Sequence, residues 1–403
     1  MKSDENHSKS CIFAFVNRLT TLLFIFSLLL SFSVSAQKIT FSDWKKIVPS
    51  DALPKNVKTR HSNNNVDLTK YHGKYYMVFR TAPTHFASVK TKMYVLSSYD
   101  LKKWDYETQF HLGTDMREPR FLIYKDQLFL YFFQGGKNPF GFHPQHIFMS
   151  RFQTAGNWTP NESIGLDGYV DWRFRTRNDT AYLSAYYGVD LYKASHHGDL
   201  RLFYSTDGKS WKPISEEAQV TRPGAEEGEF IFDKKGNLWA TIRLESEGAL
   251  ICYADRDSIY KWHTVHSDYK FDSALMFERD DDIYVVSRRN LDGTLNKAPE
   301  WLPYWIRQKY NLLRYSFTQK CTALFKFNKK LMRLDHIMDF PSTGDNAFPA
   351  IAQADDNSYI LMNYSSDFTK RSKNWIRGQL GKTFIYMAKL NFSLDGIDAS
   401  FLH

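Results

Sequence analysis

The chain has 403 residues, 43% of them hydrophobic and 24% charged, which is the composition of a soluble globular protein with a large core. Its formal net charge of +9 is compatible with binding to an anionic glycan, and also with a basic surface that contacts only water. The sequence contains no nucleic-acid-binding motif, so we expect no nucleic-acid partner. After residue 36 only Cys252 and Cys321 remain, which excludes a disulfide framework and leaves open whether these two pair.

Residues 1–36 have the pattern of a secretory signal peptide. Basic residues precede the apolar run LTTLLFIFSLLLSFSV, and the small residues Val34 and Ala36 stand where a signal peptidase reads the chain. Cleavage after Ala36 leaves residues 37–403, which contain no run long enough to span a membrane. We therefore expect a secreted or periplasmic protein that is a single domain and a monomer, without a stable membrane anchor.

From residue 63 onward one pattern recurs. A polar cluster opens an apolar strand, a charged or glycine hairpin follows, and an aromatic-rich strand returns. The copies occupy residues 63–81, 115–133, 171–188, 226–243, 272–290 and 345–367. Their spacing is that of propeller blades, and further strands lie between them. The sequence predicts an all-β fold, a six-bladed β-propeller, with a five-bladed one as the alternative if one unit is irregular. Residues 299–312 are the best helical candidate, as an insertion in the fifth blade.

The polar residues that open the first strands are expected to meet at one central pocket, because the inner strands of a propeller all begin at the same face. These residues are Asn65, Asp67, Asp115, Glu118, Asp171, Glu227, Asp272 and Asp345. The ends of the second strands bring Arg80, Arg243 and Arg288 to the same face. Carboxylates and arginines around one funnel are typical of a glycosidase, although a single polar strand end indicates only contact with water.

Two short segments resemble turns of known propeller glycosidases. SSYDLKKW (97–104) resembles the Ser-x-Asp-Leu-x-x-Trp turn of arabinanase- and xylosidase-type propellers, and STDGKSW (205–211) resembles the Asp-box of sialidase-like repeats. In both, the resemblance implies that an Asp carboxylate caps a tight turn while a Trp packs between blades. These turns are structural, so this resemblance bears on the fold more than on the chemistry.

The segment AEEGEFIFDKKGNLWATIR (225–243) resembles both families at one residue. Arabinanase-type enzymes open a blade with a Glu-Gly pair ahead of a hairpin glycine, and sialidases have a Glu at a similar place with an Arg at the end of the next strand; Glu227 and Arg243 match these positions. The resemblance implies that Glu227 is the general acid and that Arg243 is a substrate clamp. VDWRFRTRNDTAYL (170–183) resembles the arabinanase-type blade whose Asp orients that acid, which implies this role for Asp171.

Two positions depart from these patterns and leave the second catalytic group open. Spacing puts Asn65 where the arabinanase-type pattern has its base, and Phe348 where sialidases have a nucleophilic Tyr. Neither side chain can take that role. The base is therefore expected among Asp67, Asp115 and Asp345.

Substrate binding is expected from a set rich in arginine, because arginine binds carboxylates in bidentate fashion, which favours an anionic sugar. The set is Arg80, Arg117, Glu118, Arg120, Arg243, Asp272, Arg288 and Tyr364. HPQH (143–146) and HH (196–197) lack the ligand spacing of a zinc site, so we expect no metal and no cofactor.

Glycoside hydrolysis needs one protonated carboxyl group and a second carboxylate, and these acids supply both. The predicted function is a secreted, exo-acting glycoside hydrolase that acts on an oligo- or polysaccharide, with an anionic sugar favoured by the arginines. Two alternatives stay open. One is a glycan-binding propeller that has lost its base, and the other is a polysaccharide lyase that uses His143 or Tyr364 near the axis.

Overall fold

The computed structural model describes residues 37–139, 141–189 and 198–394, so the expected signal peptide and the HH pair (196–197) lie outside the described residues. The chain divides into two compact units, Ser42–Lys389 and a small one formed by the segments up to Phe41 and from Leu390. In the small unit, β1 (Gln37–Phe41) pairs antiparallel with the last residues of β27 (Thr383–Leu394), with Phe41 opposite Leu390.

The larger unit contains six antiparallel sheets. The first has β3 (Ser62–Tyr71), β4 (Lys74–Ala82), β5 (Lys92–Ser98) and β6 (Asp105–Phe110). The second has β7 (Met116–Tyr124), β8 (Gln127–Gln134), β9 (Ile147–Thr154), β10 (Asn157–Trp158) and β11 (Glu162–Ser163). The third has β12 (Tyr169–Arg177), β13 (Thr180–Tyr187), β14 (Asp199–Ser205), β15 (Lys212–Pro213) and β16 (Val220–Thr221). The fourth has β17 (Ala225–Phe232), β18 (Leu238–Leu244), β19 (Gly248–Ala254) and β20 (His263–Ser267). The fifth has β21 (Asp272–Arg279), β22 (Asp282–Asn290), β23 (Lys320–Asn328) and β24 (Arg333–Phe340). The sixth has β25 (Asn346–Asp355), β26 (Ser358–Ser366), β27 and, from the start of the chain, β2 (Lys45–Val48).

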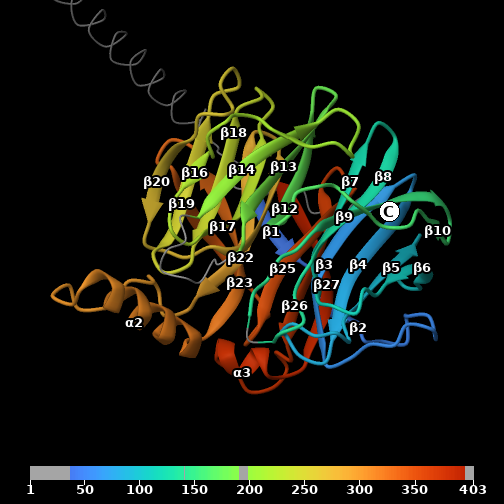
Figure 1. The fold of residues 1–403 in the computed structure, drawn as a ribbon. Coiled ribbons are helices and arrows are strands. Elements are labelled where there is room, and N and C mark those ends of the chain that lie inside the picture. The colour runs from blue at the N-terminus through green and yellow to red at the C-terminus, as the bar shows by residue number, and fades with distance from the viewer. Residues whose placement is uncertain (1–36, 140, 190–197, 395–403) are drawn as a thin grey trace, which may run out of the picture. The chain divides into compact units, whose positions relative to one another are not determined.

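These sheets form a six-bladed β-propeller, which confirms the predicted fold (Figure 1). The first strand of each sheet packs against the first strand of the next sheet, and β25 packs against β3, so the inner strands close a ring. The sixth sheet is completed by β2, which pairs antiparallel with β27 and places Lys45 opposite Met387. Each repeat found in the sequence is the first hairpin of one sheet, and a hairpin is a local structure that a local pattern can specify.

The two turns singled out in the sequence have the predicted structural role. The Asp100 carboxylate accepts the backbone N–H groups two and three residues further on, at 2.8 and 3.1 Å, and Trp104 is buried. The Asp207 carboxylate accepts the corresponding N–H groups at 2.7 and 2.8 Å, and Trp211 is buried. Each turn therefore fixes its own backbone and delivers a large apolar side chain to the core.

The helical insertion in the fifth blade is confirmed, but it starts later than predicted. The helix α2 (Tyr304–Phe317) lies between β22 and β23. Pro303 stands directly before it, and Pro299 lies in the first part of the predicted stretch; proline lacks the N–H that a helix interior requires. A short second helix, α3 (Trp375–Gln379), follows β26.

Two expectations about the whole chain can be compared with this structure. Among the described residues, no helix combines the length and the apolar character that crossing a membrane requires. Cys252 and Cys321 are both buried and free, so they do not pair with each other.

Candidate active site

Every inner strand carries a β-bulge near its start, at the same place in all six sheets. The register breaks lie between Asn64 and Asp67, Arg117 and Arg120, Asp171 and Arg173, Glu226 and Glu229, Asp272 and Leu275, and Ala347 and Ala350. A bulge bends its strand and re-aims the side chain of the extra residue. The first residues inside the breaks, which we call the bulge residues, are Asn65, Glu118, Trp172, Glu227, Ser273 and Phe348.

Most of the bulge residues have a left-handed backbone. Their φ angles are 46° at Asn65, 51° at Glu118 and Glu227, 53° at Ser273 and 47° at Phe348. This conformation is uncommon for a residue with a side chain and costs about 1 kcal/mol or more at each position. Strain of this kind clusters at ligand sites, where the surrounding structure maintains it. Its recurrence at five of the six bulge residues therefore marks this level of the ring as a candidate site.

Aromatic rings fill the axis at this level. Trp172 and Phe348 belong to the third and sixth sheets, on opposite sides of the ring, yet their ring centroids lie 5.5 Å apart. Phe348 also stacks on Tyr364 at 5.9 Å, and the Arg120 guanidinium lies 5.1 Å from the Trp172 ring. Phe348, at the place where spacing put the sialidase tyrosine, thus packs against tryptophan and closes the axis.

Glu118 has the setting of a titratable acid. Its Oε1 accepts a hydrogen bond from Asn65 Nδ2 at 3.1 Å, whereas its Oε2 lies 3.6 Å from Arg120 Nη2 and has no hydrogen-bond partner in the described part of the chain. Burial raises the pKa of Glu118 to about 7 against the lowering effect of Arg120, and the charge of Glu227 adds to the rise. A group with this pKa can exchange a proton near neutral pH, as acid–base catalysis requires.

Asp171 and Asp67 are buried beside the same arginine, Arg120. Neither oxygen of Asp171 has a hydrogen-bond partner within the described ranges, and burial raises its pKa well above the ordinary value, with Glu118 adding to the effect. Asp67 accepts the backbone N–H of Phe121 at 2.7 Å, and burial raises its pKa too. Asp67 therefore ties β3 to β7, while Asp171 is a buried acid whose protonated form is favoured by burial and by the charge of Glu118.

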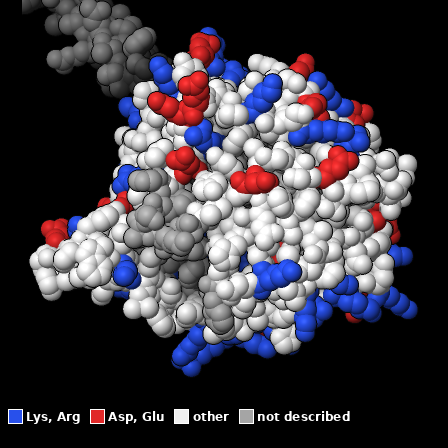
Figure 2. Space-filling view, in the orientation of Figure 1, with Lys and Arg blue, Asp and Glu red and all other residues white. Residues whose placement is uncertain are grey.

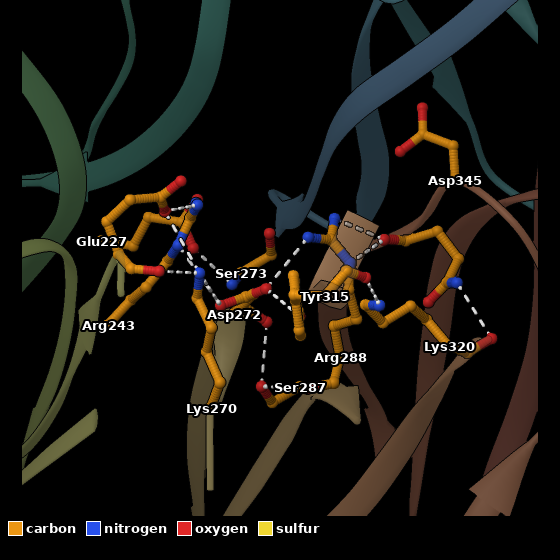
Figure 3. A network of polar contacts seen from close by, with 12 residues as sticks. Glu227, Arg243, Lys270, Asp272, Ser273, Ser287, Arg288, Tyr315, Lys320 and Asp345 are labelled. Atoms are coloured by element: carbon orange, nitrogen blue, oxygen red, sulfur yellow. Dashed lines mark hydrogen bonds and ion pairs between the residues drawn. The ribbon is translucent and has the colours of Figure 1, made fainter. Parts of the chain in front are cut away.

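Arg243, at the end of β18, contacts four carboxylates, and Figure 3 labels two of them, Glu227 and Asp272. Its Nη1 donates to Glu227 Oε1 at 2.7 Å, and its Nη2 donates to Glu245. Its Nε lies 3.1 Å from Glu226 Oε1 and 3.3 Å from Asp272 Oδ1. We call these five residues the Arg243 cluster. One guanidinium thus contacts four carboxylates that are largely shielded from water.

The carboxylates of the Arg243 cluster differ in protonation. In Glu245, the charges of Arg243 and of a neighbouring lysine outweigh burial and lower the pKa to about 2. In Glu226, burial raises the pKa well above its ordinary value despite Arg243, and Glu245 adds to the rise. Glu227 accepts hydrogen bonds at both oxygens, from Arg243 and from the Ser273 N–H at 2.6 Å. Donors therefore face both oxygens of Glu227.

Asp272 connects the Arg243 cluster to Arg288 and to the helix α2 (Figure 3). It accepts a hydrogen bond from Arg288 Nη1 at 3.3 Å and another from the Tyr315 hydroxyl group. Three neighbouring cations, Lys270 first, outweigh burial and lower the pKa of Asp272. Arg288 also donates to the backbone carbonyl of Asn346 at 2.7 and 2.9 Å, so it joins the fifth sheet to the sixth.

Asp115 is the centre of a second ion-pair group. It accepts hydrogen bonds from Arg80 Nη2 at 2.7 Å, from Arg117 Nε at 2.6 Å and from the Thr91 hydroxyl at 2.7 Å. Burial would raise its pKa, but Arg117 and Arg80 outweigh burial and lower it. A carboxylate that is occupied by three donors is an anchor for arginines and is poorly placed to take a proton from water.

Asp345 lies in the sixth sheet and reaches the same region. It accepts the Tyr364 hydroxyl at 2.9 Å and lies 2.7 Å from His85 Nδ1. Burial and the charge of Asp345 raise the pKa of Tyr364 well above its ordinary value, so the phenol keeps its proton. His85, Arg117 and His143 line a pocket of about 400 Å³. Asp115 lines this pocket as well, so the pocket opens beside the second ion-pair group.

Sequence reasoning missed Glu245, Lys270, His85 and Tyr315. Glu245 stands two residues after Arg243, and residues two apart on a strand face the same side, so the sequence does contain a signal for it. His85 and Tyr315 come from segments outside the six repeats, where no register argument applies. Within the described ranges, no three His, Cys, Asp or Glu side chains gather as metal ligands do.

Comparison with known proteins identifies the fold. No family model matches the sequence, and no curated protein matches it. Solved structures do match, and they show that the chain has a sialidase-like β-propeller fold. A protein of unknown function from Dyadobacter fermentans DSM 18053 superimposes with a TM-score of 0.61 at 12% identity, over 88% of this chain and 99% of that chain.

Two enzymes are among the other matches. Trypanosoma rangeli sialidase, in complex with the inhibitor DANA, has a TM-score of 0.59 at 10% identity, over 87% of this chain and 59% of the sialidase chain. The endosialidase of phage phi92 has a TM-score of 0.57 at 11% identity, over 90% of this chain and 71% of that chain. Identities this low establish the shared fold, while the chemistry has to be argued from the site.

Proposed function

We propose that this chain is an exported, exo-acting glycoside hydrolase that takes an anionic sugar at the centre of its propeller. The proposal is carried by Glu118 and Glu227, which occupy the same bulge position on β7 and β17 in opposite electrostatic settings. Burial raises the pKa of Glu118 to about 7, whereas Glu227 accepts hydrogen bonds from Arg243 and the Ser273 N–H. A protonated carboxyl group and an ionised one are what cleavage of a glycosidic bond requires.

In this scheme Glu118 donates a proton to the glycosidic oxygen, and Glu227 is the carboxylate that balances the positive charge of the transition state. This exchanges the roles assigned from the sequence, in which Glu227 is the acid. The exchange is supported by the donors that already face both oxygens of Glu227. Asp171 lies buried in electrostatic contact with Glu118, and in this scheme it is a neighbour of the acid that does not touch substrate.

An anionic sugar is supported by the charge at the pocket. Arg117 lines the pocket of about 400 Å³, and its side chain is partly exposed there. Arginine binds a carboxylate in a fixed, two-point geometry. Among the structures that share the fold, one of Trypanosoma rangeli sialidase contains sialic acid, at 10% identity and a TM-score of 0.55.

The test is sugar release from a panel of sialylated, uronic-acid-containing and neutral glycans, read by chromatography. Glu118→Gln and Glu227→Gln should each lower kcat/KM by about a hundredfold or more. Glu107→Gln is the matched control, because Glu107, on β6 of the first sheet, is also a buried glutamate but accepts from the Ser97 hydroxyl and from the Gly156 N–H of the second sheet. Wild-type activity should fall as pH rises through about 7, where Glu118 loses its proton. Full activity in both glutamine variants would refute the assignment.

A glycan-binding protein without turnover is the second candidate, and one observation favours it. Phe348 packs on Trp172 and fills the axis at the place where a sialidase has its nucleophile. Glycan binding without any released product would support this candidate over the hydrolase. For the lyase alternative, the Tyr364 phenol stays protonated and its hydroxyl group donates a hydrogen bond to Asp345, so Tyr364 cannot act as the base. Of the two candidate bases, His143 then remains. An unsaturated product that absorbs ultraviolet light would identify that reaction.

A further inference from the structure

The helix α2 is an insertion that serves the site with one face only. It carries three basic residues and no acidic one, since its sequence is YWIRQKYNLLRYSF. Asn311 and Tyr315 are its buried residues. The Tyr315 hydroxyl donates to Asp272, and the Asn311 side chain accepts the backbone N–H groups of Lys297 and Ala298 at 3.1 Å each. These contacts of the inward face hold α2 against the propeller, so the opposite face is not needed for that purpose.

The opposite face of α2 carries an apolar stripe. Ile306, Tyr310, Leu313 and Phe317 follow one another at helical spacing, which is the pattern by which a helix buries one side. Yet Leu313 is 64% exposed and Phe317 is 57% exposed. In Figure 1, α2 lies outside the six sheets, and nothing described in the chain covers this stripe.

Aromatic residues extend the stripe at the start of the helix. Trp301 is 81% exposed and Trp305 is 59% exposed, and Tyr304 is exposed beside them. Lys309 lies over the Trp305 ring, with its Nζ 5.2 Å from the centroid. A soluble protein rarely leaves a contiguous group of large apolar side chains in water without a partner for it. We call Trp301, Trp305, Tyr310, Leu313 and Phe317 the α2 apolar face.

The α2 apolar face borders a basic surface. Phe317 lines a hollow of about 630 Å³ together with Arg371, Lys373 and Arg377 around α3, and no acidic residue lines it. In the region of Figure 2 where Figure 1 shows α3, blue atoms gather, while the area of α2 is mostly white. None of these three basic side chains forms an ion pair within the described part of the chain. The partner of this surface therefore has to be apolar at α2 and anionic beside it.

We propose that the α2 apolar face and the basic residues around α3 form a docking surface for an anionic lipid membrane. The helix would lie in the membrane interface, as amphipathic helices do that combine Trp, Phe and Leu on one side with basic residues nearby. With 14 residues, α2 is about 21 Å long, enough to place all of its stripe at the boundary between headgroups and acyl chains. The binding is peripheral and reversible, and it does not depend on the proposed hydrolase activity.

Two other occupants fit the surface less well. A second copy of this chain would bring Arg371, Lys373 and Arg377 against the same residues of its partner, which like charges oppose. A glycan would use the faces of Trp301 and Trp305, but it would leave the aliphatic Leu313 in water. A lipid surface accepts the aliphatic, aromatic and basic residues together.

The test is flotation of the full chain with vesicles of phosphatidylcholine alone, or with phosphatidylglycerol in equal part. The N-terminus is treated alike in every sample, so differences between variants report on α2. Leu313→Gln with Phe317→Gln should lower partitioning to the mixed vesicles by about tenfold or more. Lys373→Glu with Arg377→Glu should lower it about tenfold on mixed vesicles and leave the weak binding to pure phosphatidylcholine unchanged.

Matched controls keep the result specific. Tyr99→Gln removes an aromatic side chain that is 73% exposed on the first sheet, and Lys235→Glu reverses an exposed charge at the β17–β18 turn. Both should float like the wild type, and circular dichroism should show that all variants are folded. A wild-type protein that does not float with mixed vesicles, or α2 variants that float equally well, would overturn the proposal. Dimerisation lost in Leu313→Gln with Phe317→Gln would overturn it in favour of a second copy.

Discussion

Replacing Arg243 by methionine tests whether one guanidinium holds the Arg243 cluster together. Methionine keeps an unbranched side chain but removes the donors to Glu227 and Glu245 and the charge that lies within 3.3 Å of Glu226 and Asp272. Removing one partner of a buried ion pair costs about 3–5 kcal/mol, because the remaining charge stays buried without a counter-ion. For roughly 350 residues, with an unfolding entropy of about 2.1 cal/mol/K per residue, this is a fall in Tm of about 4–7 °C.

The effect should depend on pH in a defined direction. Although burial opposes it, Arg243 lowers the pKa of Glu245 to about 2, below the 4.5 of a free glutamate. A carboxylate whose pKa is lowered by folding stabilises the protein above its unfolded pKa, and this contribution disappears as pH falls through the folded value. The difference in Tm between the wild type and Arg243→Met is therefore expected to be largest at neutral pH and to narrow below pH 4.5.

Scanning calorimetry over a pH series measures this difference. The control is Arg289→Met, because the one ion pair that Arg289 forms among the described residues is with Asp339, at 2.8 Å, and both side chains are more than a third exposed. Such a pair contributes about 1 kcal/mol or less. If Arg243→Met lowers Tm no more than Arg289→Met does, or if the gap stays constant in acid, the carboxylates are not held by the charge of Arg243.

Three further changes test other parts of the site. Asp115→Asn leaves the buried Arg80 and the partly exposed Arg117 without their carboxylate, so urea denaturation should show a loss of about 3 kcal/mol or more, and a loss below about 1 kcal/mol would contradict the ion-pair description. Trp172→Ala leaves a hole opposite Phe348 and should cost about 3–5 kcal/mol; unchanged stability would mean that the axis is not packed there. Burial lowers the pKa of Lys320 to about 6 in the folded protein, against 10.5 in the unfolded chain. Between these two pH values the unfolded state binds one more proton than the folded state, so the free energy of unfolding rises with pH. Lys320→Met should remove this dependence on pH from a series of urea denaturation curves, and an unaltered slope would be evidence against a lowered pKa of Lys320.

The architecture could be predicted because its unit is local. In each repeat the polar start, the apolar run, the hairpin and the returning strand lie within one stretch of sequence, and antiparallel pairing of such neighbours needs no distant partner. The six-bladed ring follows from counting these units. The start of α2 was misplaced because the aromatic pattern of residues 299–312 extends over two prolines that the helix excludes from its interior.

The chemistry of the site was less accessible, because it depends on partners from other sheets. In the sequence, Glu118 stands between Arg117 and Arg120, which suggests an ion-paired carboxylate. In the structure, Arg117 turns to Asp115, and Arg120 donates to a backbone carbonyl of the third sheet. Arg120 stays within 3.6 Å of Glu118, but burial outweighs its charge, and burial depends on the other sheets, so neighbours in the sequence do not reveal the pKa of Glu118.

The pairing of β2 with β27 makes the sixth sheet depend on both ends of the larger unit. β2 comes from the first strands of the larger unit and β27 from its last, so the sixth sheet lacks an outer strand until both ends have been made and have met. The blade that closes the ring, with β25 packed against β3, is thus the one whose outer strand comes from the other end of the unit. Truncation at either end of the larger unit would therefore leave the closing blade incomplete, whereas the other five blades are each built from one continuous stretch of chain.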